Sequence, residues 1–265
     1  MRTVKFEQLR PKEICDEKER FSVVYLPIGP LEWHGPHLPV GMDPLNAEAV
    51  SRLVAENIGG VVLPTFYWGT EREREPEMCK SIGFKEDEWI IGMDFPANIM
   101  PSFYASEDTF GIAVREYLNL LVKQKYKLIV IVNGHGAENH ISVLNRLAKE
   151  FTAETESTVL YVMAIINDEN VEKDIGHATK LETSILKYLY PESLDLSLLP
   201  PRDEKLYNLD YAVVDGETFG GNPTSDFSVR HDPRDATIEI GRNSIGRAVK
   251  VISEMVIDKW QEINK

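Results

Sequence analysis

Glu32 and His34 are the first residues of the chain whose types and spacing could do chemistry, and Asp43 follows them closely. In an extended segment, residues two apart project to the same side, so Glu32 and His34 can address one point. Carboxylate and imidazole ligands suit a divalent ion such as zinc, manganese or iron(II), and Asp43 could bridge two such ions. Two alternatives stay open, because Asp43 before Pro44 is also a usual start of a helix, and Glu32 and His34 could lie in a surface loop. His37 is expected to be structural.

A second group lies in VNGHGAENH, residues 132–140, between an apolar strand pattern and an amphipathic helix pattern. In open parallel sheets, ligands bind beyond the carboxyl ends of the strands, which is where His135 falls. The segment with Glu32 lies at the same edge by the same rule, so two distant loops are expected to converge. Glu138 begins the helix, where the helix dipole also favours a carboxylate. His140 is expected to pack or hydrogen-bond within that helix.

A third group is GHATKLETS, residues 176–184. His177 could shuttle a proton, because the ordinary pKa of imidazole lies near neutrality. Thr179 and Glu182 also fit a capping box, which would explain Glu182 without a metal. Five of the six histidines lie in these three groups, and each group carries a carboxylate, so the clustering favours a metal site. GxSxG, P-loop and GxGxxG motifs are absent, which argues against a serine hydrolase or a nucleotide-binding loop.

The elements that must position these residues alternate along the chain. Apolar, β-branched runs predict strands at 21–28, 60–67, 127–132 and 158–166, and helical patterns cover 44–57, 109–125, 138–152, 179–190 and 243–263. Such alternation predicts an α/β fold with a mostly parallel sheet covered on both faces. The weakly periodic stretches 68–108 and 191–242 are candidate lids or oligomer contacts. The run EREREPE within the first could also be a solvated turn.

Composition restricts the function classes. The 265 residues, 43% of them hydrophobic, can bury a substantial core, and we expect one domain over 1–265. A net charge of -14 argues against a nucleic-acid partner. Cys15 and Cys79 form no CxxC pair and suggest neither a disulfide framework nor a thiolate zinc site. No apolar run is long enough to span a bilayer and no leader pattern is seen, so no membrane partner and a cytoplasmic location are expected.

The motifs resemble those of the creatininase (creatinine amidohydrolase) family. LPIGPLEWHGPHLP with Asp43 resembles the opening motif of that family, P-x-G-S-x-E-x-H-G-x-H-L-P followed by a spaced aspartate. VNGHG resembles its NGHG segment, GHATKLETS its H-A-x-x-x-E-T-S segment, and DPRDATIEIG its terminal D-P-x-x-A-T-x-x-x-G. The resemblance extends in order over 21–241, which is most of the chain.

This resemblance implies a three-layer αβα fold with a mostly parallel sheet, a homohexamer, and two divalent ions per chain (zinc, manganese or iron). Glu32 and His135 would hold one ion, His34 the other, and Asp43 both. The fifth ligand would be a glutamate of the last or the middle motif, with Glu182 preferred and Glu138 as the alternative. His177 and Glu182 are the catalytic candidates.

The expected function is hydrolysis of a C–N bond, other than a peptide bond, in a small and cyclic amide by a metal-activated water. Lys173 stands where creatininase has a tryptophan, Asp174 is retained and Pro30 replaces a serine, so the substrate is expected to differ from creatinine. The family also includes enzymes that open a cyclic ketone, deformylate an opened purine or cleave a modified peptide. The alternatives are therefore C–C hydrolysis of a ring ketone, purine deformylation, and, from another class, a catalytically silent binding protein for a small molecule.

Overall fold

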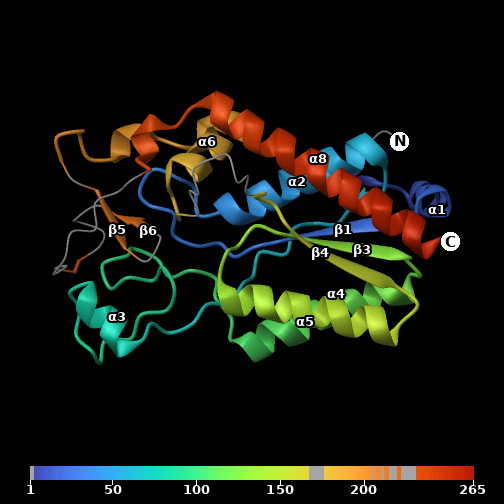
Figure 1. The fold of residues 1–265 in the computed structure, drawn as a ribbon, viewed down its shortest axis with the longest axis horizontal. Coiled ribbons are helices and arrows are strands. Elements are labelled where there is room, and N and C mark those ends of the chain that lie inside the picture. The colour runs from blue at the N-terminus through green and yellow to red at the C-terminus, as the bar shows by residue number, and fades with distance from the viewer. Residues whose placement is uncertain (1–2, 167–175, 205, 210–211, 215–219, 222–230) are drawn as a thin grey trace.

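A four-stranded parallel sheet forms the centre of the computed structural model, which describes residues 3–166, 176–204, 206–209, 212–214, 220–221 and 231–265 (Figure 1). The strands lie in the order β2 (Val61–Val62), β1 (Val23–Ile28), β3 (Leu128–Asn133) and β4 (Thr158–Met163). All neighbouring pairs are parallel. The predicted α/β fold with a parallel sheet is thereby confirmed.

Both faces of this sheet are covered by helices. Val23 and Tyr25 of β1 pack into one core cluster, and Val24 and Leu26 into another, because successive strand residues point to opposite faces. On the first face lie α2 (Met42–Ile58), α6 (Lys180–Leu189) and α8 (Ile238–Ile263), and on the second α4 (Glu107–Lys123) and α5 (Glu138–Glu154) (Figure 1). The resulting architecture is the three-layer αβα arrangement that the family resemblance implied.

The carboxyl ends of β1 and β3 lie side by side. The last residue of β1, Ile28, is in register with the last residue of β3, Asn133, and the backbone N–H of Gly134 donates to the Ile28 carbonyl at 2.9 Å. The loops that leave these two strands therefore start from the same edge of the sheet, as the sequence predicts for the segments with Glu32 and His135.

Most predicted elements are present, and the differences have local causes. The run 60–67 pairs as a strand only over Val61–Val62, because Pro64 has no N–H for the ladder. The C-terminal helix begins earlier than expected, at Ile238, where the hydroxyl of Thr237 caps it by accepting from the Ile240 N–H at 3.2 Å. Helix α1 (Pro11–Arg20) was not among the predicted elements.

The two weakly periodic stretches contain short elements. The first stretch, 68–108, holds α3 (Pro76–Ser81). Ile90, Met93 and Phe95, which follow α3 in the same stretch, pack with Trp33 in a separate small core cluster. The second holds the antiparallel pair β5 and β6 and several one-turn helices: η2 (Pro191–Ser193), η3 (Leu196–Leu198), β5 (Tyr207–Leu209), β6 (Ala212–Val214) and η4 (Pro233–Asp235). A further turn, η1 (Phe6–Gln8), precedes α1. Lys173 and Asp174 lie outside the described residues.

No helix in the described part of the chain combines the length and the apolar composition that a bilayer crossing requires.

Candidate metal centre

Glu32, Asp43 and His135 meet at the carboxyl edge of the sheet. The Nδ1 atom of His135 lies 3.0 Å from Glu32 Oε2 and 3.0 Å from Asp43 Oδ2. All three side chains are buried, and their ligand atoms lie within 4.8 Å of one another. This triad joins the loop after β1, the first turn of α2 and the loop after β3, so the predicted convergence of distant segments is present.

His34, Asp43 and Glu182 form a second triad with the same spread of ligand atoms. The Nε2 atom of His34 lies 3.3 Å from Asp43 Oδ1 and 3.9 Å from Glu182 Oε2. The two triads share Asp43, and its two oxygens face different histidines. Asp43 could therefore serve an ion held by either triad.

Asp43 does not cap its helix, which was the alternative interpretation of this residue. The N-cap of α2 is Gly41, and no side chain makes the capping hydrogen bond there. Both oxygens of Asp43 are instead engaged with histidines, although the first turn of the helix also favours a negative charge.

Gly134 permits the close approach of the β3 loop to Asp43. A Cβ atom at this position would lie 2.1 Å from the carbonyl oxygen of Asp43, which no side chain can tolerate. The preceding Asn133 fixes the turn: its side-chain oxygen accepts from the His135 N–H at 2.9 Å, and its amide donates to the His135 carbonyl at 2.7 Å. The Asn-Gly pair therefore sets the position of His135 beside Asp43.

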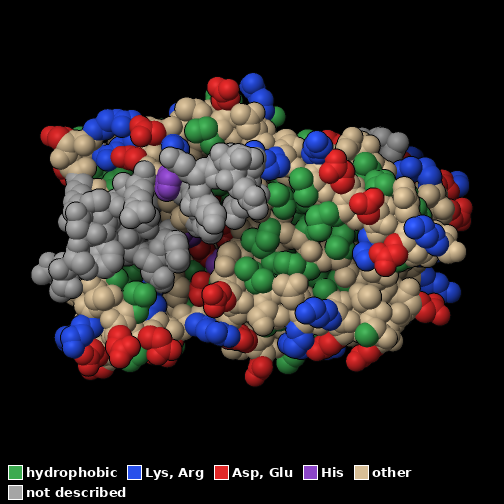
Figure 2. Space-filling model, in the orientation of Figure 1, with side chains coloured by type: hydrophobic (Ala, Val, Ile, Leu, Met, Phe, Trp, Pro, Cys, Tyr) green, Lys and Arg blue, Asp and Glu red, His purple; other side chains and the backbone are tan. Residues whose placement is uncertain are grey.

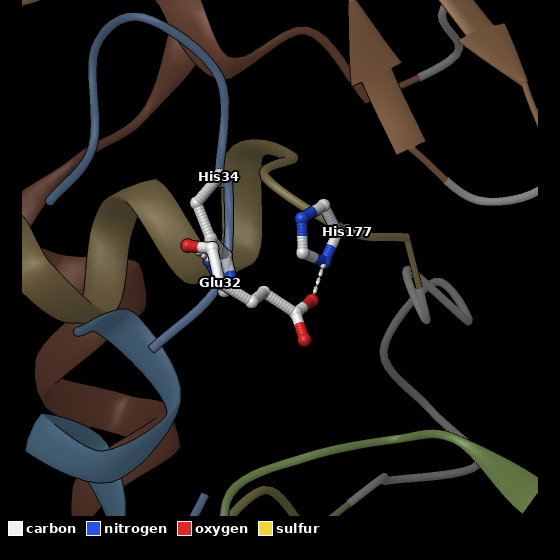
Figure 3. A group of neighbouring side chains, drawn as sticks. All are labelled: Glu32, His34 and His177. Carbon is white, nitrogen blue, oxygen red and sulfur yellow. Dashed lines mark hydrogen bonds and ion pairs between the residues drawn. The ribbon is translucent and has the colours of Figure 1, made fainter. Parts of the chain in front are cut away.

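His177 lies against the same cluster, as Figure 3 shows for Glu32, His34 and His177. Its Nδ1 is 3.1 Å from Glu32 Oε1, and its Nε2 is 2.5 Å from the carbonyl oxygen of Trp33. Because a carbonyl only accepts, the Trp33 contact places a proton on Nε2 and leaves Nδ1 as the atom that gains or gives up a proton. Glu32, His34 and His177 also form a group with ligand spacing, so the geometry permits a ligand role for His177 as well.

Glu182 serves both its helix and the cluster. One of its oxygens accepts from the backbone N–H of Ala178 at 2.5 Å, just before α6, while the same oxygen faces His34. The side chain of the N-cap residue, Thr179, makes no capping bond. The capping box that the sequence allowed is therefore not formed, because Glu182 accepts from the N–H of Ala178, the residue before the N-cap, and not from that of Thr179.

The other candidates lie apart from the triads. Glu138 is exposed at the first position of α5 and belongs to none of the described groups with ligand spacing. His37 Nε2 lies 3.0 Å from the Thr183 hydroxyl, and His140 Nε2 lies 3.1 Å from the Asn133 side-chain oxygen. His37 and His140 therefore have the structural, hydrogen-bonding character that the sequence suggested.

The burial of these groups changes their affinity for protons in the metal-free protein. Burial raises the pKa of Glu182 to about 8. Burial alone would lower the pKa of His34, but the carboxylates of Asp43, Glu182 and Glu32 together outweigh it and raise the pKa to about 10. Burial and the neighbouring His34 lower the pKa of His177 to about 4. Burial opposes ionisation of Glu32, but His135 and His177 nevertheless keep the pKa of this carboxyl below its usual value.

Two residues of the site were missed by the sequence analysis. The hydroxyl of Tyr104 donates to Glu32 Oε2 at 3.1 Å, and Glu71 Oε1 lies 3.9 Å from His135 Nε2. Burial raises the pKa of the Glu71 carboxyl. Glu71 belongs to the run EREREPE, for which the sequence predicts a lid, an oligomer contact or a solvated turn, and neither residue stands in a motif with ligand spacing. No sequence signal distinguished them.

The donor set fits divalent ions. Three carboxylates and two histidines gather there, and all five residues are at most 9% exposed. The Nε2 atoms of His34 and His135 make no hydrogen bond within the described part of the chain. Buried carboxylates with imidazoles are the oxygen and nitrogen donors that zinc, manganese and iron(II) prefer. Figure 2 shows acidic and histidine side chains at a hollow in one face of the molecule.

Comparisons with known proteins identify relatives of this chain. The chain is 28% identical over 190 residues to creatinine amidohydrolase of Pseudomonas putida, covering 66% of each protein. It is 23% identical to 3-dehydro-scyllo-inosose hydrolase of Thermotoga maritima, over 71% of this chain and 57% of that protein, so it spans less than two thirds of either relative. A mycofactocin precursor peptide peptidase of Mycolicibacterium smegmatis is 26% identical over 90% of this chain and 85% of its own length.

A crystal structure of creatinine amidohydrolase superposes with a TM-score of 0.68 at 21% identity, covering 98% of this chain and 99% of that chain, which establishes the shared fold. The sequence model of the family described as creatininase, creatinine amidohydrolase, matches residues 7–256 of the 265. The chain therefore belongs to the creatininase family of hydrolases.

Proposed function

We propose that this protein is a metal-dependent amidohydrolase that cleaves a C–N bond in a small, cyclic amide. One observation carries the proposal: the two triads of potential ligands share Asp43, with Oδ1 towards His34 and Oδ2 towards His135. A pair of ions bridged in this way is suited to hydrolysis, because it can activate water and orient a carbonyl together. The 28% identity to creatinine amidohydrolase supports an amide substrate.

Two divalent ions would be held, one by Glu32, Asp43 and His135 and the other by His34, Asp43 and Glu182. Creatininases of the same fold are known in zinc–zinc and manganese forms, which supports zinc or manganese here. When bound, such ions lower the pKa of a coordinated water towards neutrality and polarise a substrate carbonyl. Glu182 rather than Glu138 is the fifth ligand in this proposal, because only Glu182 lies within reach of His34.

His177 is proposed to carry a proton to the departing nitrogen. Its Nε2–H is held by the Trp33 carbonyl, so Nδ1, which faces Glu32, is the atom that exchanges a proton. Burial and the neighbouring His34 lower the pKa of His177 to about 4 in the metal-free protein, so the ring is neutral at neutral pH and, once protonated during the reaction, gives its proton up readily.

The experiment that tests the proposal is metal content per chain after reconstitution and desalting, for the unmodified protein and for Asp43→Ala. We expect close to two ions, with both lost or strongly weakened in the variant because Asp43 contributes to both triads. Glu138→Ala is the matched control, since this carboxylate lies near the same sheet edge but outside the triads. An unmodified protein that retains no ion would contradict the proposal and favour the silent binding protein.

A second candidate is hydrolysis of a ring ketone with cleavage of a C–C bond, which the 23% identity to 3-dehydro-scyllo-inosose hydrolase supports. The same site would serve, because water attack on a carbonyl is common to both reactions. A panel of lactams, formamides and cyclic diketones separates the two: turnover of lactams supports the amidohydrolase, and turnover of diketones alone supports the ketone hydrolase. Turnover of formamides would instead favour purine deformylation.

A further inference from the structure

The second ring nitrogen of His135, Nε2, has no acceptor among the residues that the structure describes. His135 is 4% exposed, and its Nδ1 faces both Glu32 and Asp43 at 3.0 Å. When Nδ1 serves the ion, a neutral ring keeps its single proton on Nε2. That nitrogen is buried and makes no hydrogen bond to a described residue. Because a buried N–H without a partner is destabilising, a metal-bound His135 needs an acceptor on this side.

Glu71 is placed to be that acceptor. Its Oε1 lies 3.9 Å from His135 Nε2, and its side chain is 20% exposed. Its other oxygen, Oε2, accepts from the Arg72 N–H at 3.0 Å, while Oε1 makes no hydrogen bond within the described part of the chain. A direct hydrogen bond is shorter than the present separation, so Oε1 must approach Nε2 by about 1 Å. A shift of this size lies within reach of a side chain with three rotatable bonds.

Tyr104 acts on the same triad from the same segment. Its hydroxyl donates to Glu32 Oε2 at 3.1 Å, and this is the oxygen that lies 3.0 Å from His135 Nδ1. The donation holds the carboxylate in the orientation that addresses His135. Neither Tyr104 nor Glu71 contacts the His34 side of the cluster through a hydrogen bond or ion pair among the described residues.

The segment that supplies both residues, 69–104, is fixed on both sides of Glu71. Gly69 bridges to Tyr104, and Glu73 bridges to Ile91. The Arg74 guanidinium donates to the Gly92 carbonyl at 2.9 and 2.6 Å. The segment also packs on Trp33, the residue between Glu32 and His34, through the small cluster with Ile90, Met93 and Phe95. These contacts hold the segment as a wall of the metal site.

We propose that Glu71 and Tyr104 are positioning residues of the metal centre: Tyr104 orients Glu32, and Glu71 accepts the Nε2–H of His135 so that Nδ1 is directed at the ion. The proposal rests on the two-ion site proposed above and assigns the two residues to one of its ions. Metal-bound histidines commonly donate their other ring N–H to a carboxylate, and loss of such a partner lowers metal affinity by about 10- to 100-fold.

The test is a two-site metal titration by chelator competition with zinc, and with cobalt as a spectroscopic substitute. Glu71→Met keeps the length of the side chain but removes the strong acceptor, and Tyr104→Phe removes only the hydroxyl. We expect each to weaken one ion of the pair by about 10- to 100-fold. The cobalt spectrum of that ion should change, while the other ion stays tightly bound. Glu71→Gln, which keeps an acceptor oxygen, should retain most of the affinity.

Glu73→Met is the matched control, because Glu73 is exposed on the same segment. Thermal unfolding of the metal-free variants separates a loss of ligand orientation from a loss of fold. Unchanged affinity for both ions in Glu71→Met would overturn the role of Glu71, as would equal losses in Glu71→Met and Glu71→Gln. If Glu71→Met does not fold, Tyr104→Phe decides, and wild-type affinity for both ions in that variant would overturn the proposal. An unmodified protein without bound ions would instead refute the proposed function itself.

Discussion

At the scale of single residues, Asp43 and Glu182 are expected to have different consequences for the metal centre. Asp43 belongs to both triads, whereas Glu182 belongs to only one. We predict that Glu182→Ala loses one ion of two and keeps the ion beside His135, while Glu138→Ala keeps both. Metal analysis after desalting measures this difference. Loss of an ion in Glu138→Ala, with both ions retained in Glu182→Ala, would reverse the assignment of the fifth ligand.

Substitution of His177 can distinguish whether this residue is a metal ligand or a proton carrier. Its Nδ1 faces Glu32 at 3.1 Å, and its other nitrogen is occupied by the Trp33 carbonyl. We predict that His177→Ala lowers kcat by about 10²- to 10⁴-fold, the usual contribution of a positioned general acid or base, while two ions stay bound. The measurement is kcat on the best substrate of the panel, with metal content determined on the same sample. A variant that loses an ion would show that His177 is a ligand.

At the scale of elements, the sequence predicted the regular parts of the site well. The register of β1 with β3 and the motifs at their ends bring Glu32, His34, Asp43 and His135 together, because parallel strands end at a common edge, and α6 adds Glu182. The sequence predicts the stretch 68–108 only as a candidate lid or oligomer contact, since its pairing depends on isolated bridges and a separate core cluster rather than on periodicity. Glu71 and Tyr104 were therefore not predictable from spacing.

The turn before His135 requires a residue without a side chain at position 134, and this requirement can be tested. A Cβ on Gly134 would lie 2.1 Å from the Asp43 carbonyl oxygen, whereas a Cβ on Gly136 would meet nothing within 4 Å. Gly134→Ala should therefore force the β3 loop away from α2 and destabilise the protein by roughly 1–3 kcal/mol, as overpacking of a close contact does. It should also weaken metal binding through His135. Gly136→Ala is the matched control in the same loop.

Urea unfolding of the two metal-free variants, followed by metal titration, measures both effects. Equal stability and equal metal affinity of Gly134→Ala and Gly136→Ala would show that the loop can move without cost, and the placement of His135 by the Asn-Gly turn would then be wrong.

At the scale of the whole molecule, several predictions concern properties that the fold alone does not decide. One domain over 1–265, a homohexamer and a cytoplasmic location stay predictions. The protein has a net charge of -14 and also gathers buried carboxylates at one edge of its sheet. The negative charge of these buried carboxylates must be neutralised for the chain to fold. In the metal-free protein, histidines and protons provide this neutralisation, and bound ions would replace them.

Metal binding should consequently release protons. Burial raises the pKa of Glu182 to about 8, and the surrounding carboxylates, Asp43 first, raise that of His34 to about 10 against the effect of burial, so both groups hold protons at pH 7 in the metal-free protein. A ligand must lose its proton to bind an ion, so metal affinity should fall as pH drops below about 10, where His34 gains a proton, and more steeply below about 8, where Glu182 gains one too. Calorimetric titration with zinc in two buffers of different ionisation enthalpy at pH 7 measures the protons released. Because ions bind only the folded chain, the metal-dependent increase in Tm should also be larger at pH 8 than at pH 6. Glu182→Gln should release fewer protons than the unmodified protein, and an affinity independent of pH would show that these two groups are not ligands.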